Sequence, residues 1–200
     1  MLRVGLTGGL ASGKSFVGRA LADLGCHLIQ ADELGRQAIQ PGGEAYEAVV
    51  AEFGPGILDP DGAVDRAKLA EIVFNDPERL ARLNALVHPI VIRREEELMA
   101  ELARRDPGGI AVVEAAILIE TGSYRRFDRI VLAWCRPEQQ IERALERGLS
   151  REQALARLRQ QMPLDEKRKY AHYIIDTSGS HEETLRQVRE LYHCLREIAR

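Results

Sequence analysis

Four residues near the start of the chain have the types and spacing of a phosphate-binding loop. Gly8, Gly13, Lys14 and Ser15 fit the pattern GxxxxGK followed by Ser or Thr. Glycines let successive backbone N–H groups point at phosphate oxygens, and the N-terminus of the following helix adds partial positive charge. In such loops the lysine reaches the β- and γ-phosphates and the hydroxyl holds Mg²⁺. The pattern predicts a site for a nucleoside triphosphate with Mg²⁺, bound by Gly8, Gly9, Leu10, Ala11, Ser12, Gly13, Lys14, Ser15 and Phe16.

Kinases, GTPases and motor proteins all use such a loop, so other segments must decide among them. Asp59-Pro60-Asp61-Gly62 has the DxxG form of a GTPase, but it is a turn within a helical pattern and no NKxD sequence follows. Residues 136–169 carry nine basic and six acidic side chains, which makes this segment a candidate clamp for anions. A short chain with a central helical insertion and a later arginine-rich segment favours a small-molecule kinase, in which an acceptor domain and a lid close over the phosphates.

The loop stands between a predicted strand and a predicted helix. Residues 2–7 are apolar, and a helical pattern of apolar residues follows the loop up to Leu24. Residues 26–30 predict a second strand, which closes a strand-helix-strand unit. Short apolar runs predict further strands at 110–113, 129–134 and 173–175. Together they predict an α/β protein with a parallel sheet of about five strands.

The remaining segments have helical periodicity. The pattern is continuous from about residue 42 to residue 105 and predicts a helical insertion, in which His88-Pro89 breaks one helix and starts the next. Pro137 and Ser150 predict the starts of two later helices, and a final amphipathic helix is expected to pack on the sheet.

Composition excludes several classes of protein. The chain has 200 residues, 45% hydrophobic and 30% charged, which is typical of one compact globular unit with an insertion. Its 28 basic and 31 acidic residues give a net charge of −3, so the composition predicts no nucleic acid or membrane partner. No apolar run is long enough to span a bilayer, and glycines interrupt any signal-peptide pattern at the start. The three cysteines lack metal-ligand spacing and are expected to be buried and reduced, which favours a cytoplasmic location.

Four stretches of the chain, taken together, resemble the dephospho-CoA kinase family in order and spacing. They are residues 5–15 (GLTGGLASGKS), Ala31-Asp32, residues 83–89 (LNALVHP) and Gln161-Met162-Pro163. The phosphate loop is common to many families, but its combination with the other stretches is specific, and the resemblance covers nearly the whole chain. Enzymes of this family transfer the γ-phosphoryl group of ATP to the ribose 3′-hydroxyl of dephospho-CoA. The resemblance therefore implies dephospho-CoA as the small-molecule substrate, and ATP with Mg²⁺ as cofactors.

The same resemblance implies an architecture. It predicts the three-layer α/β fold of P-loop nucleoside-triphosphate hydrolases, with a parallel five-stranded sheet of order 2-3-1-4-5 and ligands at the carboxyl ends of the strands. Residues 1–34, 106–135 and 171–200 would form the nucleotide-binding core. Residues 35–105 would form a helical acceptor domain that binds the CoA part of the substrate, and residues 136–170 a helical lid.

The family motifs also imply catalytic residues. Asp32 matches an acidic residue after the second strand, where a carboxylate can act as a base for the acceptor hydroxyl or orient it; capping the next helix is a compatible role. Thr7 matches an active-site threonine, or packs as a strand residue. Arg143 and Arg147 match lid arginines that contact ATP phosphates, or pair with neighbouring glutamates on the surface. The predicted catalytic residues are Asp32, Lys14, Arg143 and Thr7.

Further matches concern the acceptor and the metal. His88 matches the acceptor-domain motif and Gln161 the end of the lid, although a histidine among apolar residues is often a structural group. Residues 116–120 (AILIE) stand where the family has PLLFE, so the proline is lost and the glutamate is kept. Glu114 ends the third predicted strand, where it could orient Mg²⁺-bound water. The implied substrate-binding residues are Asp32, His88, Glu120 and Gln161, and the implied metal-binding residues are Ser15 and Glu114.

The chain departs from the family elsewhere, and two other functions stay open. Gln30 replaces a common aspartate, and His172 and Thr177 replace an aspartate and an asparagine. A kinase of similar architecture could act on a nucleoside monophosphate or a sugar, and a nucleotide-binding regulatory module would sense ATP without transferring it. Asp32 and the lid arginines count against the module. The chain is expected to be a monomer or a weak homo-oligomer.

Overall fold

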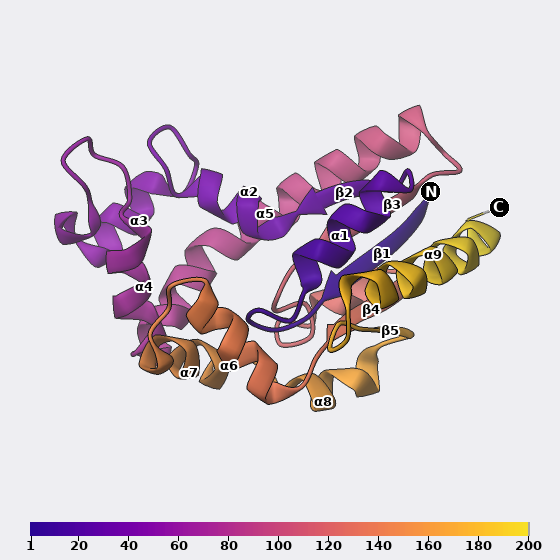
Figure 1. Ribbon diagram of the computed structural model, residues 1–200. Coiled ribbons are helices and arrows are strands. Elements are labelled where there is room, and N and C mark those ends of the chain that lie inside the picture. Colours follow the sequence, from indigo (N-terminus) through magenta and orange to yellow (C-terminus); the bar gives the residue numbers. More distant parts are fainter. Residues whose placement is uncertain (200) are drawn as a thin grey trace. The chain divides into compact units, whose positions relative to one another are not determined.

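A computed structural model describes residues 1–199 of the chain (Figure 1). The strands are β1 (Leu2–Thr7), β2 (His27–Gln30), β3 (Ile110–Glu114), β4 (Arg129–Trp134) and β5 (Tyr173–Asp176). The α-helices are α1 (Lys14–Asp23), α2 (Ala31–Ala38), α3 (Tyr46–Phe53), α4 (Arg66–Phe74), α5 (Pro77–Arg105), α6 (Pro137–Glu146), α7 (Arg151–Arg159), α8 (Leu164–Lys167) and α9 (His181–Ile198). Short 3₁₀ helices span Pro55–Ile57, Ser123–Arg126 and Arg168–Tyr170.

The strands form one parallel five-stranded sheet in the order β2-β3-β1-β4-β5. β1 lies in the centre, with Leu6 opposite Glu114 of β3 and Thr7 opposite Leu132 of β4. Because all strands run the same way, their carboxyl ends share one edge of the sheet. The observed order and direction confirm the predicted fold class.

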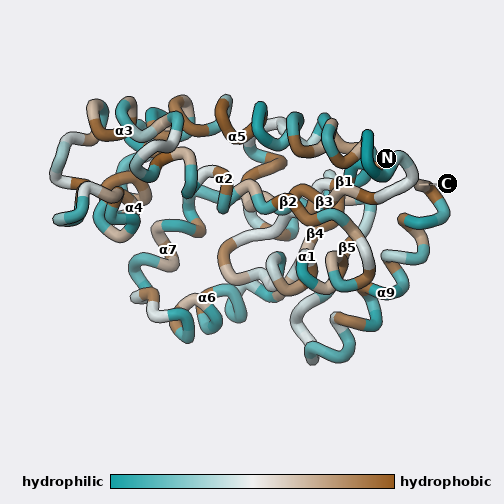
Figure 2. Tube along the Cα trace, turned by 90° about the horizontal axis from the view of Figure 1, so that it is seen from above, coloured by the Kyte–Doolittle hydropathy of each residue, from teal (hydrophilic) through white to brown (hydrophobic). Residues whose placement is uncertain are grey.

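The side chains of β1 alternate between two buried faces of the sheet. Leu2, Val4 and Leu6 pack into one hydrophobic core with residues of α1 and α9. On the other face Gly5 leaves no space for a side chain, because a Cβ there would come within 3.0 Å of side chains from β4 and from the segment after β3. Figure 2 shows α9 alternating between hydrophilic and hydrophobic residues, as a helix with one buried face should. Helices and loops therefore cover both faces of the sheet. The phosphate loop lies at the carboxyl edge because it follows the end of β1.

The chain divides into two compact units. One comprises Met1–Gln30 and the chain from Leu98 onward, and contains the sheet; the other is a helical unit, Ala31–Glu97. The predicted lid, residues 136–170, is part of the first unit, and its helices α6 and α7 contact each other. The boundaries of the helical unit differ from the predicted 35–105, because the unit starts with α2 and ends inside α5.

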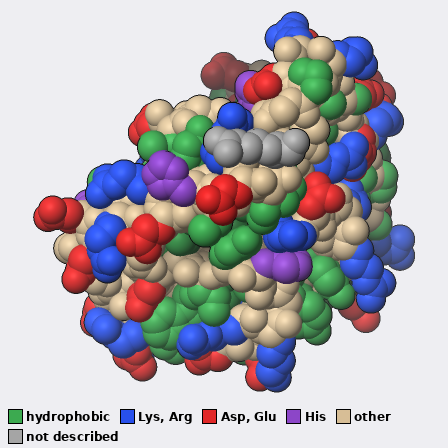
Figure 3. Space-filling view, turned by 90° about the vertical axis from the view of Figure 1, so that its right-hand side faces the viewer, with side chains coloured by type: hydrophobic (Ala, Val, Ile, Leu, Met, Phe, Trp, Pro, Cys, Tyr) green, Lys and Arg blue, Asp and Glu red, His purple; other side chains and the backbone are tan. Residues whose placement is uncertain are grey.

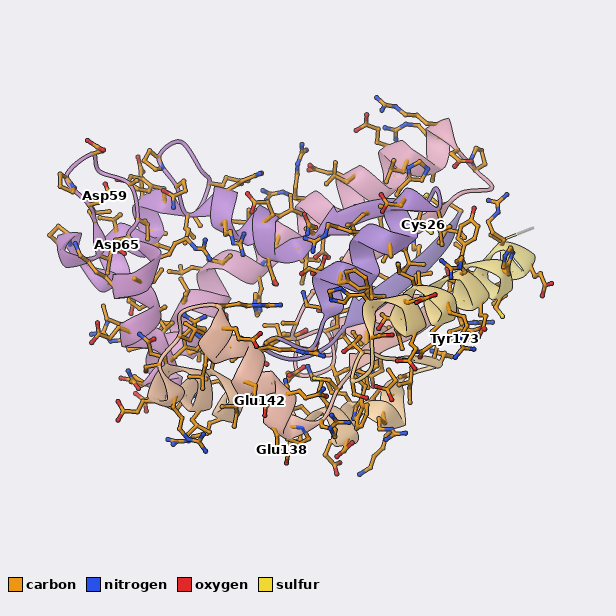
Figure 4. The ribbon with its side chains drawn as sticks, in the orientation of Figure 1. Cys26, Asp59, Asp65, Glu138, Glu142 and Tyr173 are labelled. Carbon is orange, nitrogen blue, oxygen red and sulfur yellow. The ribbon has the colours of Figure 1, made fainter. Side chains whose placement is uncertain are left out.

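The helical unit has its own core and its own turn structure. Val49 of α3 and Leu69 of α4 are buried in it. Asp65 caps α4 by accepting hydrogen bonds from two backbone N–H groups, and Asp59 accepts two others in the turn that precedes it (Figure 4). The DxxG segment is therefore a turn held by Asp59, as predicted.

One predicted helix break is wrong. The helix α5 continues from Pro77 to Arg105 with Pro89 inside it. A proline in a helix interior removes a backbone hydrogen bond and costs about 3 kcal/mol or more. Val87 and Val91, on either side of Pro89, are buried, and Gly35 of α2 lies close to both. The packing of this face offsets the cost of the proline, so the helix continues.

The cysteines are not all buried. Cys26, labelled in Figure 4, and Cys135 are buried as expected, and burial raises the pKa of the Cys26 thiol to about 11. Cys194 is exposed, contrary to the prediction. It lies on α9 outside the set of buried residues of this helix, which are Thr184, Val188, Leu191 and Leu195. Helix geometry thus places this thiol at the surface.

Candidate active site

The phosphate loop connects β1 to α1 at the carboxyl end of the central strand. Ala11 has a φ of 54° and Gly13 a φ of 84°, both in the left-handed region. This conformation costs a non-glycine residue roughly 1–2 kcal/mol, so the surrounding contacts must impose it on Ala11. Gly9 N–H donates to Ser12 Oγ at 3.1 Å, and Ser12 N–H donates to the Gly9 carbonyl at 3.3 Å. These bonds close the loop on itself, in the type of turn whose N–H groups form an anion-binding hollow.

Two glycines of the loop have no space for a side chain. A Cβ at Gly8 would lie 2.3 Å from Ser12 Oγ and 3.2 Å from the Ala133 carbonyl oxygen. A Cβ at Gly13 would lie 3.0 Å from three atoms of Thr177. Gly13 is also the N-cap of α1, where no side chain accepts a hydrogen bond from the first turn. The start of α1 therefore presents its N–H groups and its partial positive charge to an anion.

A buried carboxylate faces the end of the loop. Glu114, the last residue of β3, accepts through Oε1 from Lys14 Nζ at 2.7 Å and from Ser15 Oγ at 2.5 Å. Through Oε2 it accepts from Gln30 Nε2 at 3.2 Å. The side chains of Lys14 and Glu114 are 8% and 3% exposed, so this ion pair is desolvated. Burial raises the pKa of Glu114, but the charge of Lys14 and the hydrogen bonds from Lys14, Ser15 and Gln30 outweigh burial and lower the pKa below 4.5.

The oxygens gathered here fit a magnesium ion that is bound together with phosphates. Mg²⁺ prefers oxygen ligands, and in phosphate sites it takes one or two of them from the protein and the rest from phosphate and water. Ser15 Oγ and the ionised Glu114 carboxylate supply such oxygens. Within residues 1–199 no three His, Cys, Asp or Glu side chains group in a way that could hold a metal by themselves. The donor set therefore suits a metal that arrives with a nucleotide.

The pKa of Glu114 predicts how stability depends on pH. Since this pKa is lower in the folded chain than its usual 4.5, the unfolded chain binds more protons near that pH. The free energy of unfolding should therefore be fully supported by Glu114 above pH 4.5 and decrease as the pH falls through the folded pKa. Glu114→Gln should remove this part of the acid sensitivity. Urea unfolding of both proteins between about pH 3 and pH 7 measures it; equal pH slopes for the two proteins would contradict the assignment.

Two glutamines of the predicted lid hold the tip of the loop. Gln161 Oε1 accepts from Leu10 N–H at 2.8 Å, and Gln140 Nε2 donates to the Leu10 carbonyl at 2.7 Å. Gln140 lies on α6 and is buried, whereas Gln161 follows α7. Beside this contact is a pocket of about 180 Å³. It is lined by Gly9, Trp134, Gln140, Gln161, Met162 and Leu164, among others. The lid segment thus fixes both polar backbone atoms of Leu10.

Arg143 reaches the loop through Thr177. Its guanidinium group donates to the Thr177 carbonyl at 2.6 Å and to Thr177 Oγ1 at 3.3 Å. Thr177 Oγ1 in turn lies 2.7 Å from the Ser12 carbonyl, to which it donates. In this structure Arg143 therefore links α6 and the end of β5 to the loop.

Phe16 and Arg147 lie outside that network. The Phe16 ring stacks on the ring of His181, with 4.7 Å between ring centroids and 22° between planes. Arg147 is the C-cap of α6 and is exposed, as are Glu138 and Glu142 on the same helix (Figure 4). The two predicted lid arginines thus differ, because Arg143 is partly buried against Thr177 and Arg147 is at the surface.

The sequence prediction missed Gln140 and Lys167. Lys167 Nζ donates to the carbonyls of Gly8 and Ala116 and pairs with Glu120. Lys167 stands in a run of charged residues, 165–169, and such runs are typical of a solvated face. Lys167 follows the buried Leu164 by one helical turn, so helical periodicity alone places both on one face of α8. That periodicity is the signal that could have found it.

Three other predicted site residues, Thr7, Asp32 and His88, lie on β1, α2 and α5. Thr7 is fully buried, and its Oγ1 donates to the Ala116 carbonyl at 3.3 Å. Asp32 is exposed on the first turn of α2, which begins directly after β2. His88 lies on α5 in the helical unit, and burial lowers its pKa below 6.5. Its imidazole is therefore neutral at neutral pH.

The outer surface adds two observations. Among the helices of residues 1–199, none is both long enough and apolar enough to cross a membrane. On the face shown in Figure 3, basic and acidic side chains are interspersed. The charge of this face is therefore mixed.

The fold and the loop define the class of this protein. A parallel sheet of order 2-3-1-4-5, with a phosphate loop after its central strand and a buried Lys14–Glu114 pair beside that loop, is the arrangement of a P-loop phosphotransferase. Within this class, the chain belongs to the dephospho-CoA kinase family, whose sequence model matches residues 2–183.

Individual relatives are similar to this protein over nearly the whole chain. The dephospho-CoA kinase of Aquifex aeolicus (strain VF5) is 41% identical over 192 residues, which are 96% of each protein. The crystal structure of TT1252 from Thermus thermophilus superposes with a TM-score of 0.78 at 35% identity and covers 97% of both chains. The structure of the dephospho-CoA kinase from Campylobacter jejuni has a TM-score of 0.71 at 26% identity and covers 99% of this chain and 98% of that one. The predicted family and its kinase activity are thus confirmed.

Proposed function

We propose that this chain transfers the γ-phosphoryl group of ATP to the ribose 3′-hydroxyl of dephospho-CoA, giving coenzyme A and ADP. The observation that carries the proposal is the desolvated Lys14–Glu114 pair at the end of a closed phosphate loop, in a chain of the dephospho-CoA kinase family. A loop of this shape binds the phosphates of a nucleotide. Membership of the family indicates that dephospho-CoA is the acceptor of the phosphoryl group.

The residues of the loop bind and orient ATP. Backbone N–H groups of the loop and of the start of α1 hold the phosphate oxygens, and Lys14 neutralises the charge on the β- and γ-phosphates. Glu114 holds Lys14 in place, since the two groups are 2.7 Å apart. Ser15 and Glu114 would hold Mg²⁺, which supplies a further positive charge to the phosphates when bound. Arg143 and Arg147 of the lid segment would complete the anion clamp. To contact the phosphates, Arg143 would exchange its hydrogen bond to the Thr177 carbonyl for one to a phosphate oxygen.

The acceptor hydroxyl needs a group that receives or directs its proton. We assign this role to Asp32, which the chain places on the first turn of α2 right after a strand of the sheet. The hydroxyl oxygen attacks the γ-phosphorus, the bond to the β-phosphate oxygen breaks, the proton passes to Asp32 and ADP leaves. Thr7 supports the loop from the end of β1, through its bond to Ala116.

The helical unit and the lid segment have complementary proposed roles. The helical unit would bind the CoA part of the substrate, with the neutral His88 as one contact. Residues 136–170 would close over ATP and exclude water, which suppresses hydrolysis. Gln161 of this segment, and Glu120, which bonds to the segment at Met162, are proposed to meet the substrate at the edge of the segment. Their bonds to Met162 N–H and Leu10 N–H support a role in shaping that edge.

A competition assay tests the proposal. The purified protein is mixed with MgATP and equal amounts of dephospho-CoA, nucleoside monophosphates and simple sugars, and the products are identified by mass spectrometry. We expect a single product, one phosphoryl group heavier than dephospho-CoA, that does not form without Mg²⁺. Phosphorylation of another acceptor would favour a different small-molecule kinase. Tight binding of MgATP without any phosphorylated acceptor would favour a nucleotide-sensing module.

A further inference from the structure

Lys167 is a buried cation whose three hydrogen-bond donors are all used. Its side chain is 0% exposed, although the neighbours Glu166 and Arg168 are exposed. An ammonium group carries three N–H donors. Lys167 Nζ lies 2.9 Å from the Gly8 carbonyl oxygen, 2.6 Å from that of Ala116 and 2.9 Å from Glu120 Oε1. Every donor therefore has an acceptor, and two of the acceptors are backbone atoms.

Filling space does not explain a charge at this position. Burial lowers the pKa of Lys167, the charge of Glu120 opposes that effect, and the charge of Lys14 adds to it. An apolar side chain of similar volume would fill the same space without desolvating a charge, and such replacements of buried ion pairs are often neutral or stabilising. What the ammonium group provides beyond volume is its three hydrogen bonds, so their acceptors indicate its role.

The first acceptor belongs to the phosphate loop itself. The Gly8 carbonyl lies in the same planar peptide as Gly9 N–H, which donates to Ser12 Oγ at 3.1 Å. Holding this carbonyl fixes the orientation of the first peptide of the loop. The second acceptor, Ala116, follows β3 by two residues. Lys167 therefore sets the spacing between the segments that leave β1 and β3.

The third acceptor connects this point to the lid segment. Glu120 Oε1 also accepts from Met162 N–H at 2.9 Å, in the bend between α7 and α8. The preceding residue, Gln161, accepts from Leu10 N–H at 2.8 Å. The bend is thus fastened to the phosphate loop directly by Gln161 and through Glu120 by Lys167.

We propose that Lys167 is a positioning residue for phosphoryl transfer, which orients the first peptide of the phosphate loop through Gly8 and anchors the bend of the lid segment through Glu120. The turnover part of this inference rests on the proposed function. The nucleotide-binding part does not, because the loop binds phosphates whatever the acceptor is.

Lys167→Met tests the role at nearly constant side-chain length. Without a donor for the Gly8 carbonyl, the loop should lose its fixed geometry, and misplacement of about 1 Å costs on the order of 10²-fold in rate. We expect the Kd of MgATP, measured by titration calorimetry, to rise about tenfold and kcat to fall about 10²-fold. The KM for dephospho-CoA at saturating ATP should stay within about twofold. All measurements are made well below the melting temperature of the variant.

A matched core variant separates positioning from stability. Val188→Ala opens a cavity in the core between the sheet and α9, where Val188 is fully buried, and should lower the melting temperature without touching the loop. Its Kd for MgATP and its kcat should be those of the unmodified protein. If Lys167→Met likewise shows a lower melting temperature with normal Kd and kcat, Lys167 is only a core residue and the proposal is wrong.

Glu120→Ala keeps the test decisive if Lys167→Met does not fold. The Glu120 side chain is 20% exposed, so its removal leaves no large buried cavity, but it takes away the acceptor of Met162 N–H and the partner of Lys167. We expect the Kd of MgATP to rise and kcat to fall about tenfold. A higher KM for dephospho-CoA with a normal Kd for MgATP would reflect only the proposed substrate contact of Glu120 and would overturn its link to the loop. Normal kcat and normal Kd would overturn the link through Glu120. If the unmodified protein binds MgATP but makes no coenzyme A, the proposed function fails, and the Kd values alone decide the role of Lys167.

Discussion

Lys14→Ala should lower the turnover of dephospho-CoA by about 10³-fold or more and weaken the binding of MgATP. Lys14 is the only basic side chain among loop residues 8–16, and the site must stabilise the charge on the transferred phosphoryl group. Its removal also leaves the 3% exposed Glu114 carboxylate without its cation, so negative charge would face the phosphates. Steady-state kinetics and calorimetric titration with MgATP measure the two effects.

Lys169→Ala is the matched control for this variant. Lys169 is an exposed lysine of the lid segment that pairs with Glu166, so the same change is made away from the loop. Its kinetics should equal those of the unmodified protein. A folded Lys14→Ala protein with a normal rate would show that the phosphates bind elsewhere, and the assignment of the loop would be lost.

Asp32→Asn should lower kcat by about 10²- to 10⁴-fold, the usual range for loss of a general base. The amide keeps the size of the side chain, but it cannot take a proton from the acceptor hydroxyl. Because Asp32 is assigned to the acceptor, the Kd of MgATP should stay within about twofold. Single-turnover kinetics with bound ATP would locate the defect in the chemical step.

Glu33→Gln provides the comparison for Asp32→Asn. Glu33 is the next residue on the same first turn of α2, and its carboxylate bonds to Arg36 at 3.0 Å. Neutralising it changes the charge near the helix start equally, and should leave kcat unchanged. If the two variants had equal activity, the role of Asp32 would reduce to its negative charge near the start of α2.

The phosphate loop could be predicted from sequence because its function depends on local geometry. Glycine at position 13, a lysine and a hydroxyl at the start of a helix, and an apolar strand before them are all fixed by short-range backbone rules. The sheet order followed from a family resemblance, since periodicity alone does not say which strands pair. The structure confirms that order.

Contacts between distant segments could not be predicted in the same way. Gln140 and Lys167 reach the loop across 130 and 159 residues of sequence, and polar residues on a predicted lid look solvated until the tertiary packing is known. At Pro89 a local signal predicted a helix end that the structure does not have. Burial of Val87 and Val91 outweighs the local preference of proline to end the helix. Thr7 and Arg143 have structural partners that neither spacing nor motif could indicate.

The place of β1 in the sheet has a consequence for how the chain is made. β1 ends at Thr7, yet its two neighbours begin only at Ile110 and Arg129. At about 5–20 residues per second, a ribosome needs roughly 5–20 s to produce the first of them. The helical unit, Ala31–Glu97, is complete before either partner exists. Synthesis therefore favours a nascent chain in which the helices fold first, while an apolar strand and its glycine loop wait with both edges open to other chains.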